Sequence, residues 1–179
     1  MEVQQYFALL RGINVGGNNI IKMTDLKSCF EGMGFTRVST YIQSGNVSFF
    51  SKEDNKAKLT GKIEKELSDR FSYSSRIVLI TYRELEGIVA EAPAGFGKYP
   101  GEYKYDVMFL REGLSSPDLV NQIPLQEGVD QVWNGPGVIY FSRLGSRSSQ
   151  SKMSRIITMS FYREITIRNW NTTLMLLNL

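Results

Sequence analysis

Two loops of this 179-residue chain carry the residues best suited to bind an anion. The first, residues 11–19, places Arg11 among three glycines between an apolar run and a predicted helix. The second, residues 143–152, places Arg143 and Arg147 on a background of glycine and serine. Exposed backbone N–H groups, helix N-termini and guanidinium groups all bind phosphate, so phosphate binding is the chemistry we expect at both loops.

Both loops also have a purely structural interpretation. The glycines at 12, 16 and 17 match neither a P-loop nor a dinucleotide-binding fingerprint. They could instead serve left-handed backbone angles, with Arg11 capping a nearby carbonyl group. The cations of the second loop could likewise be solvated charges that keep the protein soluble. The sequence leaves both interpretations open.

Composition excludes several kinds of active site. The chain has no histidine, which removes the usual general base and the usual zinc ligand. Cys29 is the only cysteine, so no internal disulfide can form, and we expect it to be a small buried residue. We therefore predict no cofactor and no metal, and we identify no catalytic residue.

Charge and hydropathy limit where the protein works and what it contacts. The formal net charge of +3 permits a nucleic-acid or phosphate partner without requiring one. No stretch approaches eighteen uncharged apolar residues, and residues 1–5 are acidic and amide-rich rather than basic and apolar. We expect a cytoplasmic protein with no membrane association.

The hydrophobic pattern predicts one order of elements, strand-helix-strand-strand-helix-strand, read through the chain twice. We therefore predict an α+β fold, a tandem duplication of two ferredoxin-like (βαββαβ) units with a connecting helix and a C-terminal helix. The predicted boundaries are 1–82 for the first unit, 83–100 for the connecting helix and linker, and 101–179 for the second unit. We expect the two units to fold as one cooperative body.

Apolar runs, alternation and helical spacing locate the individual elements. In the first unit we predict strands at 6–10 and 77–80, a hairpin at 38–50, and helices at 23–33 and 59–71. A capping box from Thr81 to Glu84 opens the connecting helix. In the second unit we predict strands at 103–109 and 165–167 and a hairpin at 129–142. We also predict a short helix that starts at residue 116 and two helices at 153–161 and 170–177.

Four aromatic residues fall on the predicted middle strands of the first unit: Tyr6, Phe7, Phe49 and Phe50. RNA-recognition motifs use such positions to stack bases, which is one possible role. The basic-glycine-aromatic run of those motifs is absent from residues 45–50, and the favoured alternative is that these rings are core residues that pack one unit on the other.

Three phrases carry a family resemblance: residues 10–17, 40–47 and 168–172, which read LRGINVGG, TYIQSGNV and RNWNT. They are similar to the bacterial family known as domain of unknown function 1697. This resemblance implies a cytosolic protein of tandem ferredoxin-like shape with no established reaction, substrate or cofactor. It also implies hallmark polar positions at Arg11, Asn14, Ser44, Asn46, Arg168 and Asn169.

We expect the first strand to end at the sheet edge opposite the tip of the middle hairpin. Arg11 and Ser44 could not then share a site within one unit. A single site would instead need residues of the second unit, such as Arg168 and Asn169.

Our leading hypothesis is a non-enzymatic protein that binds a phosphate-bearing partner, either a nucleotide-like small molecule or nucleic acid. The predicted ligand-binding residues are Arg11, Asn14, Ser44, Asn46, Arg143, Arg147, Arg168 and Asn169. One alternative is a histidine-free enzyme acting on a small polar substrate at the junction of the units. Another is an interaction or sensor module that forms a homodimer through open sheet edges.

Overall fold

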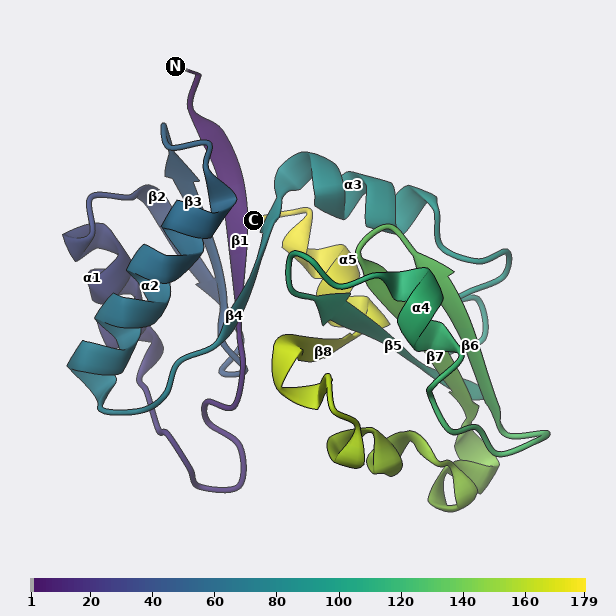
Figure 1. Cartoon of the computed structure of the whole chain (residues 1–179). Helices are drawn as coiled ribbons and strands as arrows, with labels where there is room; N and C mark the ends of the chain where they lie inside the picture. The colour runs from purple at the N-terminus through teal and green to yellow at the C-terminus, as the bar shows by residue number, and fades with distance from the viewer. Residues whose placement is uncertain (1) are drawn as a thin grey trace. The chain divides into compact units, whose positions relative to one another are not determined.

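The structure is a computed structural model that describes residues 2–179, in which the chain forms two compact units (Figure 1). The first unit runs to Leu85 and also contains Leu176–Leu179, while the second comprises Glu86–Met175. Each unit contains one four-stranded sheet in which all neighbouring strands are antiparallel. The predicted α+β class and the two separate sheets are therefore confirmed.

The first sheet has the strand order β2-β3-β1-β4. Its unit contains β1 (Gln4–Leu10), α1 (Met23–Gly32), β2 (Thr36–Tyr41), β3 (Asn46–Ser51), α2 (Lys56–Phe71) and β4 (Ile77–Thr81). Leu9 lies opposite Asn46, and Leu10 lies opposite Ile77. The end of β1 is therefore beside the starts of both β3 and β4.

One hydrophobic core joins the first sheet to its two helices, which lie on the same face of that sheet (Figure 1). Leu59, Ile63 and Leu67 recur every four residues along α2, which places all three on one side of the helix. They pack with the alternate β1 residues Tyr6, Ala8 and Leu10 and with the α1 residues Leu26, Cys29 and Phe30. Cys29 is buried, as predicted.

The aromatic residues of β1 and β3 form part of the core of the first unit. Tyr6, Phe7 and Phe49 have no exposed surface, and the rings of Tyr6 and Phe49 stack with centroids 5.7 Å apart. Phe50 is half-buried, with the Arg37 guanidinium 5.1 Å from its ring centroid. Since buried rings cannot stack on bases, base stacking is excluded for the first three. Tyr6 and Phe49 pack in the core of their own unit, and packing between the units stays a prediction.

The predicted capping box is present at the start of α3 (Tyr82–Ala90). Glu84 N–H donates to Thr81 Oγ1 at 3.1 Å, and Thr81 N–H donates to Glu84 Oε2 at 2.7 Å. Lys56 Nζ reaches the other carboxylate oxygen at 2.7 Å. Burial acts to raise the pKa of Glu84, but the hydrogen bonds from Lys56 and from the Thr81 backbone outweigh it and hold the pKa below its usual value.

Glu84→Gln is expected to lower the free energy of unfolding by about 0.5 kcal/mol at neutral pH, because glutamine keeps the cap but loses the ion pair with Lys56. A carboxyl group with a lowered pKa in the folded state stabilises above its unfolded pKa, and that contribution is lost as pH falls through the folded value. The difference between wild type and variant should therefore shrink at acid pH. Urea unfolding at neutral pH and at about pH 3 measures it. Glu86→Gln on the same helix is the control, and a pH-independent difference would contradict the assignment.

The second sheet has the strand order β6-β7-β5-β8. Its unit contains β5 (Tyr103–Leu110), α4 (Ser116–Val120), β6 (Asp130–Gly135), β7 (Val138–Leu144), β8 (Ile165–Asn169) and, as far as Met175, α5 (Trp170–Leu176). Alternate residues of β5, β7 and β8 form its core with residues that follow α4 and precede β8: Met108, Leu110, Ile123, Ile139, Phe141, Ile156, Phe161 and Ile165. Within this unit the Tyr140 hydroxyl donates to the Ile88 carbonyl oxygen at 2.6 Å, and burial raises the pKa of Tyr140 to about 12.

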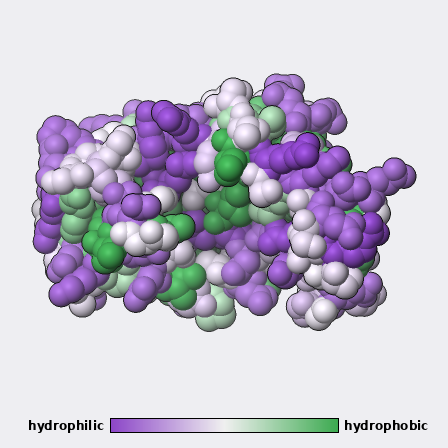
Figure 2. Space-filling model, turned by 90° about the horizontal axis from the view of Figure 1, so that it is seen from below, coloured by the Kyte–Doolittle hydropathy of each residue, from purple (hydrophilic) through white to green (hydrophobic). Residues whose placement is uncertain are grey.

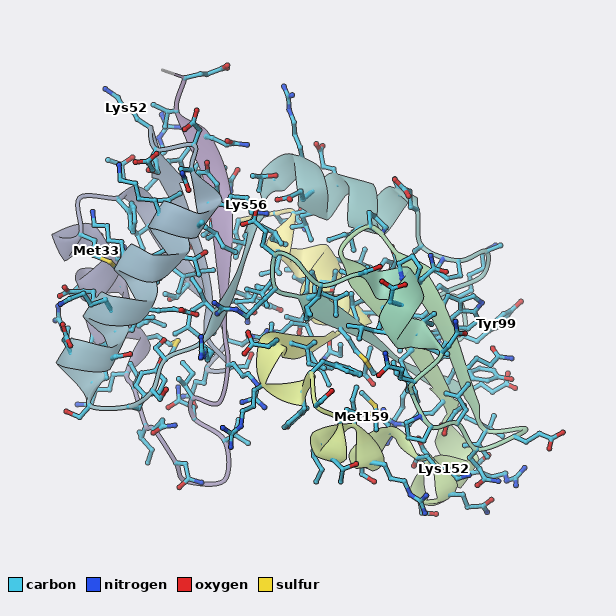
Figure 3. The ribbon with its side chains drawn as sticks, viewed as in Figure 1. Met33, Lys52, Lys56, Tyr99, Lys152 and Met159 are labelled. Atoms are coloured by element: carbon cyan, nitrogen blue, oxygen red, sulfur yellow. The ribbon has the colours of Figure 1, made fainter. Side chains whose placement is uncertain are left out.

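The α-helix predicted at 153–161 is wrong. The segment between β7 and β8 instead forms three short 3₁₀ helices, η1 (Gly145–Gln150), η2 (Met153–Thr158) and η3 (Tyr162–Glu164). Serine hydroxyls compete with backbone groups for hydrogen bonds, and this segment contains Ser146, Ser148, Ser149, Ser151, Ser154 and Ser160. Figure 3 labels Lys152 and Met159 along it.

Asp130 holds this segment in place between η1 and η2. Its Oδ2 accepts hydrogen bonds from the Gln126 N–H at 2.9 Å and the Lys152 N–H at 2.8 Å. The side chain is buried, so the 3₁₀ segment is tied to the end of the loop that precedes β6.

None of the helices within residues 2–179 is long and apolar enough to cross a membrane. Hydrophilic residues dominate the face drawn in Figure 2, where hydrophobic residues gather in a few patches.

Candidate anion-binding site

The first predicted anion loop lies beside the β2–β3 turn, and the expectation that these segments lie at opposite edges is wrong. Leu10 N–H donates to the Gly45 carbonyl oxygen at 2.8 Å, and the Asn14 side chain donates to the Gln43 carbonyl oxygen at 2.8 Å. The physical reason is strand pairing: β1 and β3 are antiparallel neighbours, so the end of one lies beside the start of the other. Arg11 and Ser44 therefore belong to the same end of one sheet.

Two hallmark asparagines at this end hydrogen-bond to the chain itself. Asn14 donates to the carbonyl oxygens of Ile21 and Gln43, and its Oδ1 accepts from the Ile21 N–H at 2.8 Å. Asn46 is fully buried and donates to the Tyr41 carbonyl oxygen at 2.9 Å and to Ser44 Oγ at 3.1 Å. The bond from Asn14 to Gln43 joins the loop after β1 to the β2–β3 turn, while the Asn46 bonds lie within the β2–β3 hairpin.

Gly45 lets the two segments approach closely. Its φ is +79°, and a Cβ atom there would lie 2.7 Å from Ile13 Cδ1 and 2.8 Å from Leu10 Cβ. Ile13 is buried, so it packs directly against the turn. This end of the first unit is thus a close-packed junction in which the asparagine amides donate hydrogen bonds to backbone carbonyl groups.

The second predicted anion loop contributes Arg143, which lies on an open part of the second sheet. Arg143 lies opposite Lys104 in the antiparallel pairing of β5 and β7, so the two side chains share one face. Asp106 is two residues along β5 on that same face, and its Oδ2 lies 2.7 Å from Arg143 Nη1. Arg143 also contacts the sulfur of Met153.

These three charged residues carry a net charge of +1 when Asp106 is ionised. Burial is the main influence on Asp106 and raises the pKa of its carboxyl group, against the opposing effect of Arg143. The carboxylate leaves other guanidinium N–H groups of Arg143 outside this contact, since arginine carries five. Lys104 is exposed, so its ammonium group is accessible to a ligand.

Two cavities of the second unit share Lys104 and Arg143. The larger, about 470 Å³, is bounded by these cations, by four serines and by apolar or aromatic side chains: Ser148, Ser149, Ser151, Ser154, Met153, Ile156, Ile157, Tyr162 and Ile167. The smaller, about 380 Å³, is bounded by the same cations together with Asp106, aromatic residues and the asparagines of the chain's last hallmark phrase. The two cations therefore lie where the cavities meet.

The first unit lacks this charged arrangement at the corresponding positions. The sheets align on a shared hydrogen bond, from Leu10 N–H to Gly45 in the first and from Leu110 N–H to Gly137 in the second. By this alignment the Lys104 and Arg143 pair corresponds to the register pair of Gln4 and Ser51. The position of Asp106 corresponds to Tyr6, which is fully buried in the core under α2. The cationic pair is thus specific to the unit whose second helix is replaced by the 3₁₀ segment.

The remaining predicted cations lie elsewhere. Arg147 is in η1, where its Nε and Nη2 both donate to Gln150 Oε1, at 3.1 and 2.7 Å, and it bounds neither cavity. Arg168 is buried and donates to Thr166 Oγ1 at 2.8 Å and to the Ile167 carbonyl oxygen at 2.9 Å. Burial lowers the pKa of Arg168 to about 10, so it stays charged at neutral pH. Asn169 bounds the smaller cavity, and its Oδ1 accepts from the Thr172 N–H in the first turn of α5.

Sequence reasoning missed Lys104 and the cavity serines. The serines lie in or just after the second predicted anion loop, but only the arginines of that loop were predicted to bind a ligand. Lys104 could have been found only by pairing its strand with the hairpin strand that carries Arg143, a register that local patterns do not define.

A cavity of about 500 Å³ in the first unit is less suited to an anion. It has a mostly apolar lining with three lysines, and Lys52 and Met33, both labelled in Figure 3, lie on its wall. Lys58 forms an ion pair with Glu53, and Lys62 donates to the Met33 carbonyl oxygen at 2.6 Å. Two of the three ammonium groups are thus already engaged.

Comparison with known proteins identifies the family. A family described as "Protein of unknown function (DUF1697)" matches residues 3–140, which is well over half of the chain. The chain belongs to the DUF1697 family. The DUF1697 match confirms the family resemblance and includes the phrases at residues 10–17 and 40–47, while it ends before Arg143 and before the third phrase at residues 168–172.

A solved structure extends the likeness beyond that point. The structure of a conserved bacterial protein from Streptococcus pneumoniae is similar with a TM-score of 0.86 and 28% sequence identity, over 99% of this chain and 98% of that one. No curated protein matches this DUF1697 member. Among residues 2–179 no three Cys, Asp or Glu side chains group closely enough to hold a metal ion.

Proposed function

We propose that this protein binds a phosphate-bearing ligand, without catalysing a reaction, at the Lys104–Arg143 pair of the second unit. The observation that carries the proposal is the register of these two cations, which face a cavity of about 470 Å³ edged by four serines. Guanidinium, ammonium and hydroxyl groups are the donors that a phosphate group accepts from, and each charge-assisted hydrogen bond is worth about 1.5–3 kcal/mol.

The ion pair with Asp106 fixes the guanidinium of Arg143 beside β5. It also reduces the positive charge there, so the attraction of an anion rests on the other N–H groups of Arg143 and on Lys104. Lys104 supplies the second charge from the neighbouring strand. Of the eight residues predicted from sequence, the proposal uses Arg143, while the pairing of Arg168 with loops of the first unit stays a prediction.

The salt dependence of binding tests this function. We expect calorimetric titration of the full chain with pyrophosphate to show binding that weakens by about threefold or more between about 50 and 200 mM salt, because exposed charges are screened. Sulfate at equal ionic strength is the control for general anion attraction. Absence of pyrophosphate binding at the lower salt concentration would overturn the proposal.

One observation favours an enzyme as a second candidate. Asp106 is a carboxyl group with a raised pKa on the wall of the 380 Å³ cavity, which is a property of general acids and bases. In that case Asp106→Asn would abolish turnover of a phosphate ester while leaving its binding largely intact. Equal stability of the ester with and without the protein would remove this candidate.

Three further proposals concern the fold of each unit, the boundaries of the units and the location of the protein. We infer that both units are ferredoxin-like, which their matching strand orders support. We further propose the boundaries 1–82, 83–100 and 101–179 for the units and their connection, and a cytoplasmic location. A homodimer formed through sheet edges is a separate prediction, which sedimentation at two protein concentrations would test.

A further inference from the structure

We infer that the 380 Å³ cavity of the second unit is a nucleobase subsite, so that the phosphate-bearing ligand is a mononucleotide. This inference rests on the proposed phosphate site, because the two cavities share Lys104 and Arg143. Lys104 and Arg143 lie on one face of the sheet, and Tyr103 and Tyr105 lie on the other. Because β8 pairs with β5 only from Asp106 onward, a ligand whose phosphate contacts the cations from the serine side would extend round the edge of β5 at residues 103–105 into the second cavity. The volumes are in the range of small-molecule sites.

Aromatic rings form the wall that would stack on the base. Tyr103, Tyr105 and Trp170 are half-buried and bound this cavity, and the Tyr103 and Tyr105 rings lie with centroids 6.2 Å apart. Every nucleobase has a π-face, so such a wall favours a base over an aliphatic group, and stacking on one ring strengthens binding by about fivefold or more.

The rings are held in position by their neighbours. Phe96 meets Tyr105 and Trp170 edge to face, with centroid distances of 4.9 and 5.1 Å. Gly97 has a φ of +80°, and a Cβ atom there would lie 2.2 Å from Trp170 Nε1, so only glycine admits the indole ring at this position. An aromatic wall fixed in this way loses little conformational freedom on binding.

Polar groups at the same cavity can recognise the edge of a base. Asn169 and Asn171 are exposed and bound it, and Asn169 uses its Oδ1 to accept the Thr172 N–H, which leaves the amide nitrogen as a donor. Amide side chains pair with the donor and acceptor pattern of bases, as in the recognition of adenine by asparagine. The smaller cavity thus combines aromatic rings and amide groups with the two cations that it shares with the larger one.

A single nucleotide fits these features better than a nucleic-acid strand. Proteins that bind single strands present several exposed rings to successive bases. The strand aromatics Tyr6, Phe7 and Phe49 of the first unit are fully buried and cannot extend the stack. We therefore commit to one base and its phosphates.

Calorimetric titration with adenosine diphosphate and with pyrophosphate tests the base subsite on the full chain. The diphosphate nucleotide should bind at least about fivefold more tightly than pyrophosphate. Tyr103→Leu should remove that advantage while changing pyrophosphate affinity less than about twofold, whereas Lys104→Gln should weaken both ligands. Tyr99→Leu, at a residue that is 60% exposed and outside the cavity, is the matched control and should change neither.

The outcomes separate this inference from the proposed function. Equal affinity for the nucleotide and for pyrophosphate would overturn the base subsite and leave the phosphate site standing, and loss of both would overturn the phosphate site as well. An RNA oligonucleotide that binds more than about tenfold tighter than the nucleotide would replace the mononucleotide with a strand. Asn171→Ala, at an exposed residue, supplies a second variant if Tyr103→Leu fails to fold, and it should likewise lower only nucleotide affinity.

Discussion

Arg143→Gln is expected to lower the affinity for pyrophosphate by about tenfold or more. The guanidinium lies on the walls of both cavities and is the strongest hydrogen-bond donor among their cations, so its loss removes at least one charge-assisted bond of about 1.5–3 kcal/mol. Lys104→Gln places at this position the residue type that the first unit has at Gln4, and we expect a loss of about threefold to tenfold. Calorimetry at low salt measures both effects.

The Asp106 ion pair requires a control for folding. Removing Arg143 leaves a buried carboxylate unpaired, which destabilises the fold by itself. The double variant Asp106→Asn with Arg143→Gln removes both charges, so it should recover stability while pyrophosphate affinity stays low. Arg163→Gln, at an exposed cation of the same unit that bounds neither cavity, should bind like wild type. Recovery of affinity in the double variant would show that Arg143 acts only through folding.

Gly45→Ala is expected to lower the free energy of unfolding by about 3 kcal/mol. The left-handed backbone costs a Cβ-bearing residue about 1–2 kcal/mol, and the new methyl group would overlap Ile13 and the Leu10 Cβ atom at distances under 3 Å. The Leu10 Cβ atom is fixed to the backbone of β1, so side-chain rotation cannot relieve the overlap. Such a loss is a large part of the stability of an ordinary domain.

Gly17→Ala is the matched control, because Gly17 also has a positive φ of +78° but has no atom within 4 Å of an added Cβ. Gly17→Ala should lower the free energy of unfolding only by the cost of the left-handed backbone, about 1 kcal/mol. Urea unfolding of both variants compares them, and equal losses would contradict the close-packed junction. Folded Gly45→Ala protein should still bind pyrophosphate like wild type, since the proposed site is in the second unit.

Local sequence patterns were sufficient for most individual elements. Apolar runs and alternation located β1, β4 and β5, and the Ser44-Gly45-Asn46 turn located the hairpin of β2 and β3. The capping box at Thr81 and Glu84 is present as predicted. Such features depend on residues close in sequence, where backbone preference and burial act together.

The helix predicted at 153–161 shows where periodicity fails. Met153, Ile156 and Phe161 have helical spacing, and Ile156 and Phe161 are indeed buried in the second core. Short 3₁₀ turns place residues three apart on one side as well, so the same spacing suits either structure. The serines in and beside this segment disfavour a longer α-helix, because their hydroxyl groups compete for backbone hydrogen bonds.

The candidate site depended on contacts that are distant in sequence. Asp106 and Arg143 are 37 residues apart, and Lys104 acquires its partner only when β5 pairs with β7 in one register. The expectation that Arg11 and Ser44 lie at opposite edges is wrong for a similar reason. It does not take into account that β1 and β3 are antiparallel neighbours in the sheet. Residue types were enough to suggest anion binding at residues 143–152. They did not identify Lys104 and Asp106, which lie beside Arg143 in the fold.

The central claim is that the phosphate site lies in the second unit and that the hallmark loops of the first unit form a structural junction. Amide NMR of the full chain during titration with pyrophosphate tests both parts at once. The account predicts chemical-shift changes at Lys104, Arg143 and residues 148–154, with residues 11–19 and 43–46 unchanged. Changes confined to residues 11–19 and 43–46 would contradict it.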